Sequence, residues 1–132
     1  MNKQLPTREQ VIFVPCDDVR QEIGNKFSFM GVYTGFDILF PKEVPQEIIF
    51  PIALVFWLTA GEGRFRYSIK VYDPNGAEVV NTPTETLDKK TNEAAMLAVK
   101  IAIKMISLGK YRIVLDLDGA QFERSLNIRR LD

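Results

Sequence analysis

The stretch Arg64-Phe65-Arg66-Tyr67-Ser68-Ile69-Lys70-Val71-Tyr72 alternates polar and apolar side chains. One face of an extended chain would carry Phe65, Tyr67, Ile69 and Val71. Because successive side chains of a strand point to opposite faces, this alternation predicts a half-buried β-strand. Asp73-Pro74-Asn75-Gly76 follows, and a turn is expected there because proline presets φ and Asn-Gly tolerates positive φ.

The same alternation predicts two hairpins. Residues 110–117 alternate, and Asp118-Gly119 offers a tight turn into a second alternating run from Phe122 to Ile128. Upstream, the apolar run from Phe50 to Thr59 is separated from Arg64 by a short glycine-bearing loop, residues 60–63. We therefore expect each of these pairs of strands to lie side by side.

Three further strands complete the expected fold: Gln10 to Pro15, Lys26 to Tyr33, and Val99 to Ile106, with a helical turn before the last. Thr82 to Asn92 is polar and is expected to be a surface loop. About seven strands separated by turn signals indicate an all-β, antiparallel two-sheet sandwich. The chain of 132 residues fits one such domain, residues 1–132.

Two aromatic residues are expected to be structural. Gly109 stands two residues before Tyr111 at the start of a strand, which resembles the tyrosine corner of immunoglobulin-like sandwiches. We expect the Tyr111 ring in the core and its hydroxyl on upstream backbone. Phe56 and Trp57 are adjacent, so they face opposite sides of a strand. A core position is favoured for both, whereas an exposed aromatic here would favour a homo-oligomer.

The charge balance argues against two classes of partner. The 17 basic and 17 acidic residues cancel, so no global positive field draws the chain to nucleic acid or an anionic membrane. The longest apolar run, Ile48 to Ala60, falls short of the ~20 residues of a membrane-spanning helix. Residues 1–8 lack the apolar core of a secretory signal, and the lone Cys16 cannot form an internal disulfide. A cytoplasmic location is expected.

The outward positions of the middle and late strands are basic. They are Arg64, Arg66, Lys70, Lys100, Lys104, Lys110 and Arg112. If these strands share a sheet, they form a basic face that could meet nucleic acid or an acidic protein. Lysine on strands also keeps exposed faces soluble. The second interpretation is favoured, because apart from Tyr72 no stacking aromatics are interleaved with the basic residues.

The segment from Cys16 to Lys26 is expected to connect the first two strands, and it is rich in charge. Its candidate binding residues are Asp17, Asp18, Arg20, Glu22 and Lys26. The three carboxylates could bind a hard cation such as calcium or magnesium. They could equally pair with Arg20 and Lys26 in a solvated connection that turns at Gly24-Asn25. The spacing matches no known ion-binding loop, so the second interpretation is favoured and no metal site is assigned.

The same segment resembles a known family. Cys16-Asp17-Asp18-Val19-Arg20, with Glu22, Lys26, Ser28 and Gly31-Val32-Tyr33, is similar to the N-terminal signature of a family of small uncharacterised bacterial proteins. That family is known only as a domain of unknown function. The resemblance implies a bacterial source and no assigned activity, and it supplies no catalytic residues.

Several kinds of chemistry are disfavoured. The chain has no histidine, which removes histidine-based nucleophilic and general-base catalysis and the usual zinc sites. Asp17 and Asp18 flank Cys16, and negative charge opposes a reactive thiolate. A carboxylate pair such as Asp116 and Asp118 could act as in glycosidases, but aspartate is common at turns for backbone reasons. We expect that the protein is not an enzyme and that it binds no cofactor.

A calcium site at one end of the sandwich is a further alternative. It would draw on Asp73, Asp116 and Asp118, with Asp17 as an additional ligand. The lead hypothesis is a non-enzymatic interaction or accessory module that contacts its partner through residues 17–26 and neighbouring loops. A small-ligand-binding or divalent-metal-binding sandwich is the alternative. The patterns leave a protein partner and a homo-oligomer open.

Overall fold

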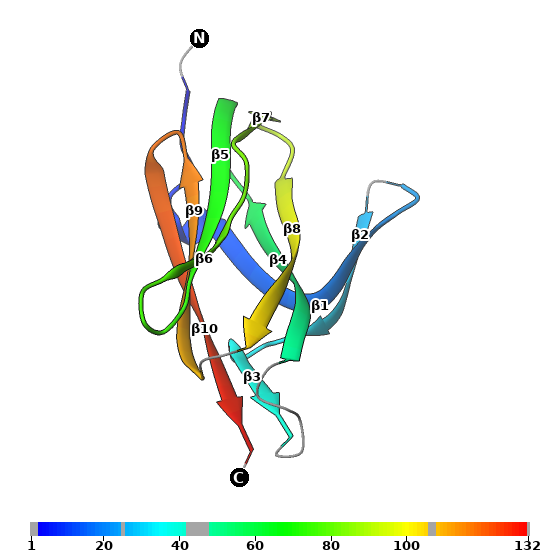
Figure 1. The fold of residues 1–132 in the computed structure, drawn as a ribbon. Helices are drawn as coiled ribbons and strands as arrows, with labels where there is room; N and C mark the ends of the chain where they lie inside the picture. Colours follow the sequence, from blue (N-terminus) through cyan, green and yellow to red (C-terminus); the bar gives the residue numbers. More distant parts are fainter. Residues whose placement is uncertain (1–2, 25, 42–47, 106–107, 132) are drawn as a thin grey trace.

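Two antiparallel-rich β-sheets pack face to face in the computed structural model, which describes residues 3–24, 26–41, 48–105 and 108–131 (Figure 1). A short 3-10 helix, η1 (Arg8–Gln10), precedes the strands. The strands are β1 (Val11–Glu22), β2 (Lys26–Val32), β3 (Asp37–Phe40), β4 (Ile48–Leu58), β5 (Gly63–Tyr72), β6 (Glu78–Asn81), β7 (Glu85–Lys89), β8 (Ala95–Met105), β9 (Gly109–Leu117) and β10 (Ala120–Arg130). The predicted all-β sandwich is confirmed.

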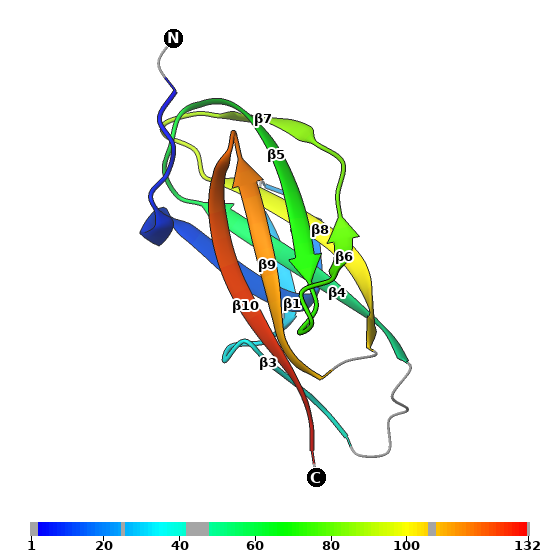
Figure 2. The same cartoon turned by 60° about the vertical axis from the view of Figure 1, so that its left-hand side comes forward.

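The two sheets differ in size and in their order of strands. One sheet has the order β2-β1-β4-β8, and the other has the order β3-β10-β9-β5-β6, with β7 paired to β5. Figure 2 shows β10, β9 and β5 side by side in front, with β1, β4 and β8 crossing behind them. The neighbours are antiparallel except for β3, which runs parallel to β10. No helix among the described residues is long and apolar enough to cross a membrane.

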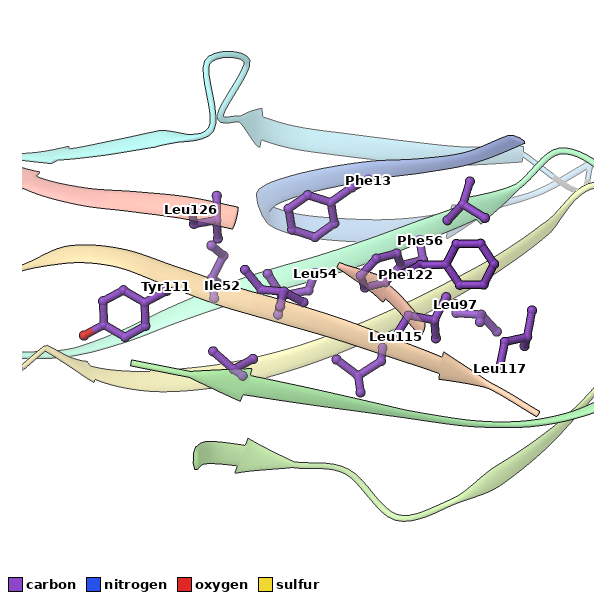
Figure 3. Close-up of a cluster of buried hydrophobic side chains, with 14 of the residues drawn as sticks. Phe13, Ile52, Leu54, Phe56, Leu97, Tyr111, Leu115, Leu117, Phe122 and Leu126 are labelled. Atoms are coloured by element: carbon purple, nitrogen blue, oxygen red, sulfur yellow. The ribbon is translucent and has the colours of Figure 1, made fainter. Parts of the chain in front are cut away.

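The main core fills the space between the sheets. Ile52, Leu54 and Phe56 point inward from β4 and meet Leu115 and Leu117 of β9 (Figure 3). All five are fully buried. Full burial of a side chain of this size stabilises the fold by about 1.5–3 kcal/mol. This contact between alternate residues of facing strands is the reason that the period-two pattern could be recognised in the sequence.

The hairpin at Asp118-Gly119 is confirmed. Asp118 has φ 51° and Gly119 has φ 89°, the two positive values that a type I′ turn requires. β9 and β10 pair on either side of it, from Leu117 with Ala120 outward. The turn at Asp73 also forms, because the Asp73 carboxylate accepts hydrogen bonds from the backbone N–H groups of Asn75 and Ala77.

The second predicted hairpin is wrong. β4 and β5 belong to different sheets, so residues 60–63 cross from one sheet to the other. Leu58 and Phe65 both point into the core from opposite sides, which a flat hairpin could not achieve. The crossing is held by backbone hydrogen bonds of 2.8 Å between Gln4 and Glu62 in both directions. Loop length did not predict the path of the chain here, because a short loop that crosses between sheets and a short hairpin loop need similar residues.

The described chain has ten strands where about seven were expected. β7 lies in the stretch predicted to be a loop, and β3 and β6 are short edge strands of four residues each. β8 begins at Ala95, so the expected helical turn is absent there and the strand takes its place. Pairing with β4 along its length overrides the helix propensity of Ala95 to Ala98. The predicted Ile106 end lies outside the described residues.

Candidate functional site

The segment predicted to connect the first two strands is itself strand. β1 continues to Glu22 and β2 begins at Lys26, with Glu22 and Lys26 as the last antiparallel pair. Gly24, at φ 91°, lies in the turn between them, and Asn25 lies outside the described residues. We call residues 17–32 the hairpin arm. Cross-strand pairing explains why so many charges could be accommodated, since a two-stranded ribbon exposes most of its side chains.

The arm bends away from the rest of its sheet. Figure 1 shows β1 curving sharply along its length, so that β2 stands at an angle to β4 and β8. In the ladder between β1 and β2, Cys16 pairs with Val32 and Asp18 pairs with Met30. Gly31 lies between these two pairs and has φ 66°. Glycine permits this conformation, which breaks the regular pleat. A Cβ at Gly31 would overlap the Asp17 carboxylate.

Asp17 and Asp18 serve different contacts. Asp17 accepts a hydrogen bond from the hydroxyl of Tyr33, and burial followed by this bond raises the pKa of Tyr33. Asp18 lies 2.8 Å from Nζ of Lys100 on β8 and 3.7 Å from Nε of Arg20. The hydrogen bond from Lys100, supported by the backbone N–H of Val19, lowers the pKa of the Asp18 carboxyl. The arm is thereby linked to the far edge of its own sheet.

A second apolar cluster lies on the outer side of this sheet. Its buried members are Cys16, Val19, Ala53 and Val55, with Val14, Phe29 and Met96 packed against them. These residues come from β1, β2, β4 and β8 and form no part of the main core. A sandwich normally exposes polar residues on its outer faces. Here the bent arm covers an apolar outer face instead.

Cys16 is fully buried in this second cluster. Burial is the main cause that raises the pKa of its thiol, and the charges of Asp17 and Asp18 raise it further. Its Sγ donates to the backbone oxygen of Asp18 at 3.3 Å. A protonated, covered thiol is a poor nucleophile, so Cys16 belongs to the packing of the arm.

An aromatic cleft opens between the arm and the outer side of β4 and β8. It has a volume of about 270 Å³, and its lining is Phe27, Phe29, Trp57, Ala94 and Met96. Every lining residue is apolar. The indole Nε1 of Trp57 is buried and has no acceptor among the described residues. We use the name aromatic cleft for these five residues.

Polar residues surround the mouth of the aromatic cleft. A second, wider cavity of about 490 Å³ shares Phe27 and Ala94 with it and adds Gln21 and Glu93. Beyond it, at the tip of the arm, the Ile23 side chain is 96% exposed. An apolar interior with a few polar groups at the opening is the usual composition of a binding pocket.

Residues 11–129 match the Family of unknown function (DUF6941). The chain belongs to this family. The match contains both sheets and the whole arm, including the residues from Cys16 to Tyr33 that carried the resemblance in the sequence. A comparison with curated proteins finds no match to the chain. Membership in DUF6941 therefore assigns no activity to the chain.

The predicted carboxylate sites do not converge. Asp73 follows the end of β5, whereas Asp116 and Asp118 lie at the opposite end of the β5–β9 pair. Asp118 accepts the backbone N–H of Arg66 at 2.8 Å and pairs with Lys3, and Asp17 belongs to the other sheet. Within the described part of the chain, no group of three potential metal ligands comes together. These aspartates serve turns and ion pairs.

The predicted basic face forms only in part. Arg64, Arg66, Lys70, Lys110 and Arg112 share the outer side of the larger sheet, because they alternate with the buried residues of β5 and β9. Lys100 lies on the other sheet, and nothing is described of the Lys104 side chain. Arg64 pairs with Asp88, Lys70 with Glu78 and Arg112 with Glu123. These carboxylates neutralise most of the face.

The two expected structural aromatics differ in their placement. Tyr111 is 1% exposed and packs in the main core (Figure 3), as predicted. Phe56 is in the core, but Trp57 faces the other way and lines the aromatic cleft, so the favoured core position of Trp57 is wrong. Phe27, Phe29 and Met96 were missed as site residues. The available signal was the apolar run on both faces of β4, which required a cover for the second face.

Proposed function

We propose that this protein is a non-catalytic interaction module that binds an apolar segment of a partner protein in the aromatic cleft. The observation that carries the proposal is the cleft itself: two phenylalanines, a tryptophan and a methionine line one opening on the outer face of a sheet. Aromatic residues and methionine are enriched at the centres of protein interfaces. The arm also contains residues 17–26, the segment that was predicted from the sequence to be the contact surface.

The size of the cleft supports a side chain as its occupant. Pockets for drug-sized ligands and cofactors occupy about 300–1,000 Å³. The aromatic cleft, at about 270 Å³, is below that range and suits one large apolar side chain. At the mouth, the Gln21 amide can donate hydrogen bonds to, or accept them from, the backbone that carries this side chain, and the Glu93 carboxylate can accept them. An extended peptide meets both requirements.

The strand beside the cleft supports an extended partner. Within the described residues β2 pairs only with β1, so its second edge offers unpaired backbone N–H and C=O groups. Phe27 and Phe29 of the same strand line the cleft. A peptide added to this edge would place alternate side chains toward the cleft, which is the mode of recognition called β-augmentation.

The other parts of the proposal rest on the sequence. The lack of histidine supports a non-catalytic role. The free, buried Cys16 is compatible with the reducing cytoplasm, where thiols persist. An immunoglobulin-like classification is supported by the buried Tyr111, and a bacterial source by the family resemblance. Two copies could also use the cleft on each other, in which case the Trp57 emission would depend on protein concentration alone.

The test uses the fact that Trp57 is the single tryptophan of the chain. Its fluorescence therefore reports on the cleft. The probe is a blocked pentapeptide with a central phenylalanine between threonines, titrated to millimolar concentration against a matched peptide with a central aspartate. We expect a saturable blue shift of the emission with the phenylalanine peptide only. Equal responses to both peptides, or no response, would contradict the proposal.

Ala94→Phe should block the site, because Ala94 is exposed and lines the cleft. This variant should keep its melting temperature and lose at least tenfold in peptide affinity. Ala77→Phe is the matched control, since Ala77 is exposed beside the β5–β6 turn on the other sheet. The Trp57 emission of the wild type could also shift with protein concentration alone. If the control shows the same shift and Ala94→Phe does not, the occupant of the cleft is a second copy of the chain.

A further inference from the structure

A third cavity lies beside β9 and β10 of the larger sheet and shares no residue with the aromatic cleft. Its volume is about 220 Å³, and its lining is Arg8, Phe13, Phe36, Lys110, Arg112, Glu123, Arg124 and Ser125. Four of these residues are cationic and one is anionic, so the lining carries four minus one, or three, positive charges. The chain as a whole is neutral, so this excess is a local feature.

Several positive charges elsewhere on this sheet pair with carboxylates. Arg64 lies 3.7 Å from Asp88, and Lys70 lies 3.8 Å from Glu78. Further along β10, Arg129 lies 3.1 Å from Asp37. The cavity instead gathers four cations, and only Glu123 contributes a carboxylate to its lining. Glu9, the neighbour of Arg8 in the chain, partly offsets their charge.

Arg124 is the most constrained of the four cations. Its guanidinium donates to three backbone oxygens, those of Glu123 and Val11 at 2.8 Å and that of Arg8 at 3.1 Å. These acceptors are neutral, so its charge has no carboxylate partner among the described residues. Burial, and then the charge of Arg8, lower the pKa of Arg124. The charge of Glu9 partly opposes this effect, but Arg124 has no direct ion pair among the described residues, and a half-buried cation without an ion-pair partner favours a nearby anion.

Arg112 is also held in place. Its Nε lies 2.7 Å from Glu123, and its guanidinium carbon lies 4.9 Å from the centre of the Tyr72 ring. No described residue accepts hydrogen bonds from its two terminal nitrogens, which can engage two oxygens of one anion. Phe13 and Phe36, whose ring centres are 5.9 Å apart, form an apolar wall of the cavity.

We propose that this cavity binds a small phosphate-type oxyanion, with Arg8, Lys110 and Arg112 as its ligands and Arg124 as a fixed positive charge behind them. The cavity is too small for a drug-sized ligand, whereas a phosphate group or a small phosphate monoester suits it. Three positive charges favour a dianion over a monoanion. The site is separate from the aromatic cleft, because the two linings share no residue.

Isothermal titration of the whole chain with sodium phosphate tests the site, with sodium chloride at matched ionic strength as the reference. We expect saturable one-to-one binding of phosphate and none of chloride. Phenyl phosphate is the second probe: tighter binding than phosphate assigns the Phe13 and Phe36 wall to the organic part of an ester, and equal binding assigns the site to free phosphate.

Arg8→Gln and Arg112→Gln should each weaken phosphate binding at least tenfold. Arg64→Gln is the matched control, because Arg64 lies on the same face, pairs with Asp88 and is absent from the cavity. Arg112→Gln also removes an ion pair, so Arg8→Gln, at an exposed position, keeps the test valid if Arg112→Gln melts early. Equal responses to phosphate and chloride, or unchanged affinity in Arg8→Gln, would overturn the proposal.

Discussion

The ammonium of Lys100 lies 2.8 Å from the carboxylate of Asp18. Asp18 is on the bent part of β1 and Lys100 is on β8, with β4 between them in the order of the sheet. The ion pair therefore links the hairpin arm to the edge strand on the other side of the sheet. Val19 and Phe29 of the arm also pack in the second apolar cluster, so the ion pair and this packing together join the arm to the outer face of the sheet.

Removing this link should loosen the arm more than it lowers the melting temperature. Exposed ion pairs contribute little to the free energy of unfolding. In Lys100→Met we expect a melting temperature close to that of the wild type, together with faster hydrogen exchange of the arm amides and a red shift of Trp57 emission. Lys70→Met breaks the pair with Glu78 on the other sheet and is the control. Equal arm exchange in both variants would show that the pair does not hold the arm.

Acid should weaken the protein through two aspartates. Hydrogen bonds from Lys100 and Lys3, respectively, lower the pKa of Asp18 and of Asp118 below the ordinary 3.8. A carboxyl with a lowered folded-state pKa stabilises the fold above its unfolded-state pKa, and this contribution disappears as the pH falls through the folded-state pKa. Melting temperatures should therefore drop below about pH 4. In Asp18→Asn the drop should be smaller, and an identical pH profile would contradict this assignment.

Alkali should weaken the protein through Tyr67. Burial, and then its 2.9 Å hydrogen bond to Glu85, raise the pKa of Tyr67 from 10.0 to about 12. A raised folded-state pKa stabilises the fold fully below pH 10, and this contribution disappears as the pH rises through the folded-state pKa. Unfolding free energies measured from pH 9 to 12 should fall in the wild type. Tyr67→Phe should fall less steeply, and a slope equal to that of the wild type would exclude Tyr67 as the source.

Gly31→Ala should destabilise the arm. Its φ of 66° costs a non-glycine residue about 1–2 kcal/mol, and the added Cβ would overlap the carboxylate of Asp17. We expect a loss of at least about 1 kcal/mol in chemical denaturation. Gly35→Ala is the control, because its Cβ would meet nothing within 4 Å. Adding Asp17→Ala should recover part of the loss, and no recovery would mean that the overlap is not the cause.

The sequence predicted the strands correctly wherever one face of a strand is buried and the other is exposed to solvent. β5, β9 and β10 are examples, and the Asp118-Gly119 turn was readable because few residues tolerate positive φ. The sequence was a poor guide to the order of strands. Whether residues 60–63 turn back or cross between sheets depends on which face Leu58 and Phe65 share, a long-range property.

The candidate site was only partly predictable. The segment from Cys16 to Lys26 was singled out for its charge, and it does form the arm. The cleft beneath it depends on the bend near Gly31, which brings Phe27 and Phe29 against Trp57 and Met96. These four residues come from three strands that are distant in the chain. No local sequence pattern predicts a contact between these residues, although the apolar outer face of β4 indicates that another segment covers it.

The proposed role of the aromatic cleft is to receive an apolar side chain of a protein partner. Its most direct test is a nuclear Overhauser measurement on the protein with labelled methionine methyl groups, in the presence of the phenylalanine pentapeptide. This role predicts contacts from the peptide ring to the methyl group of Met96 and to the indole of Trp57, both lost in Ala94→Phe. Peptide contacts that avoid Met96 and Trp57, or that persist unchanged in Ala94→Phe, would contradict it.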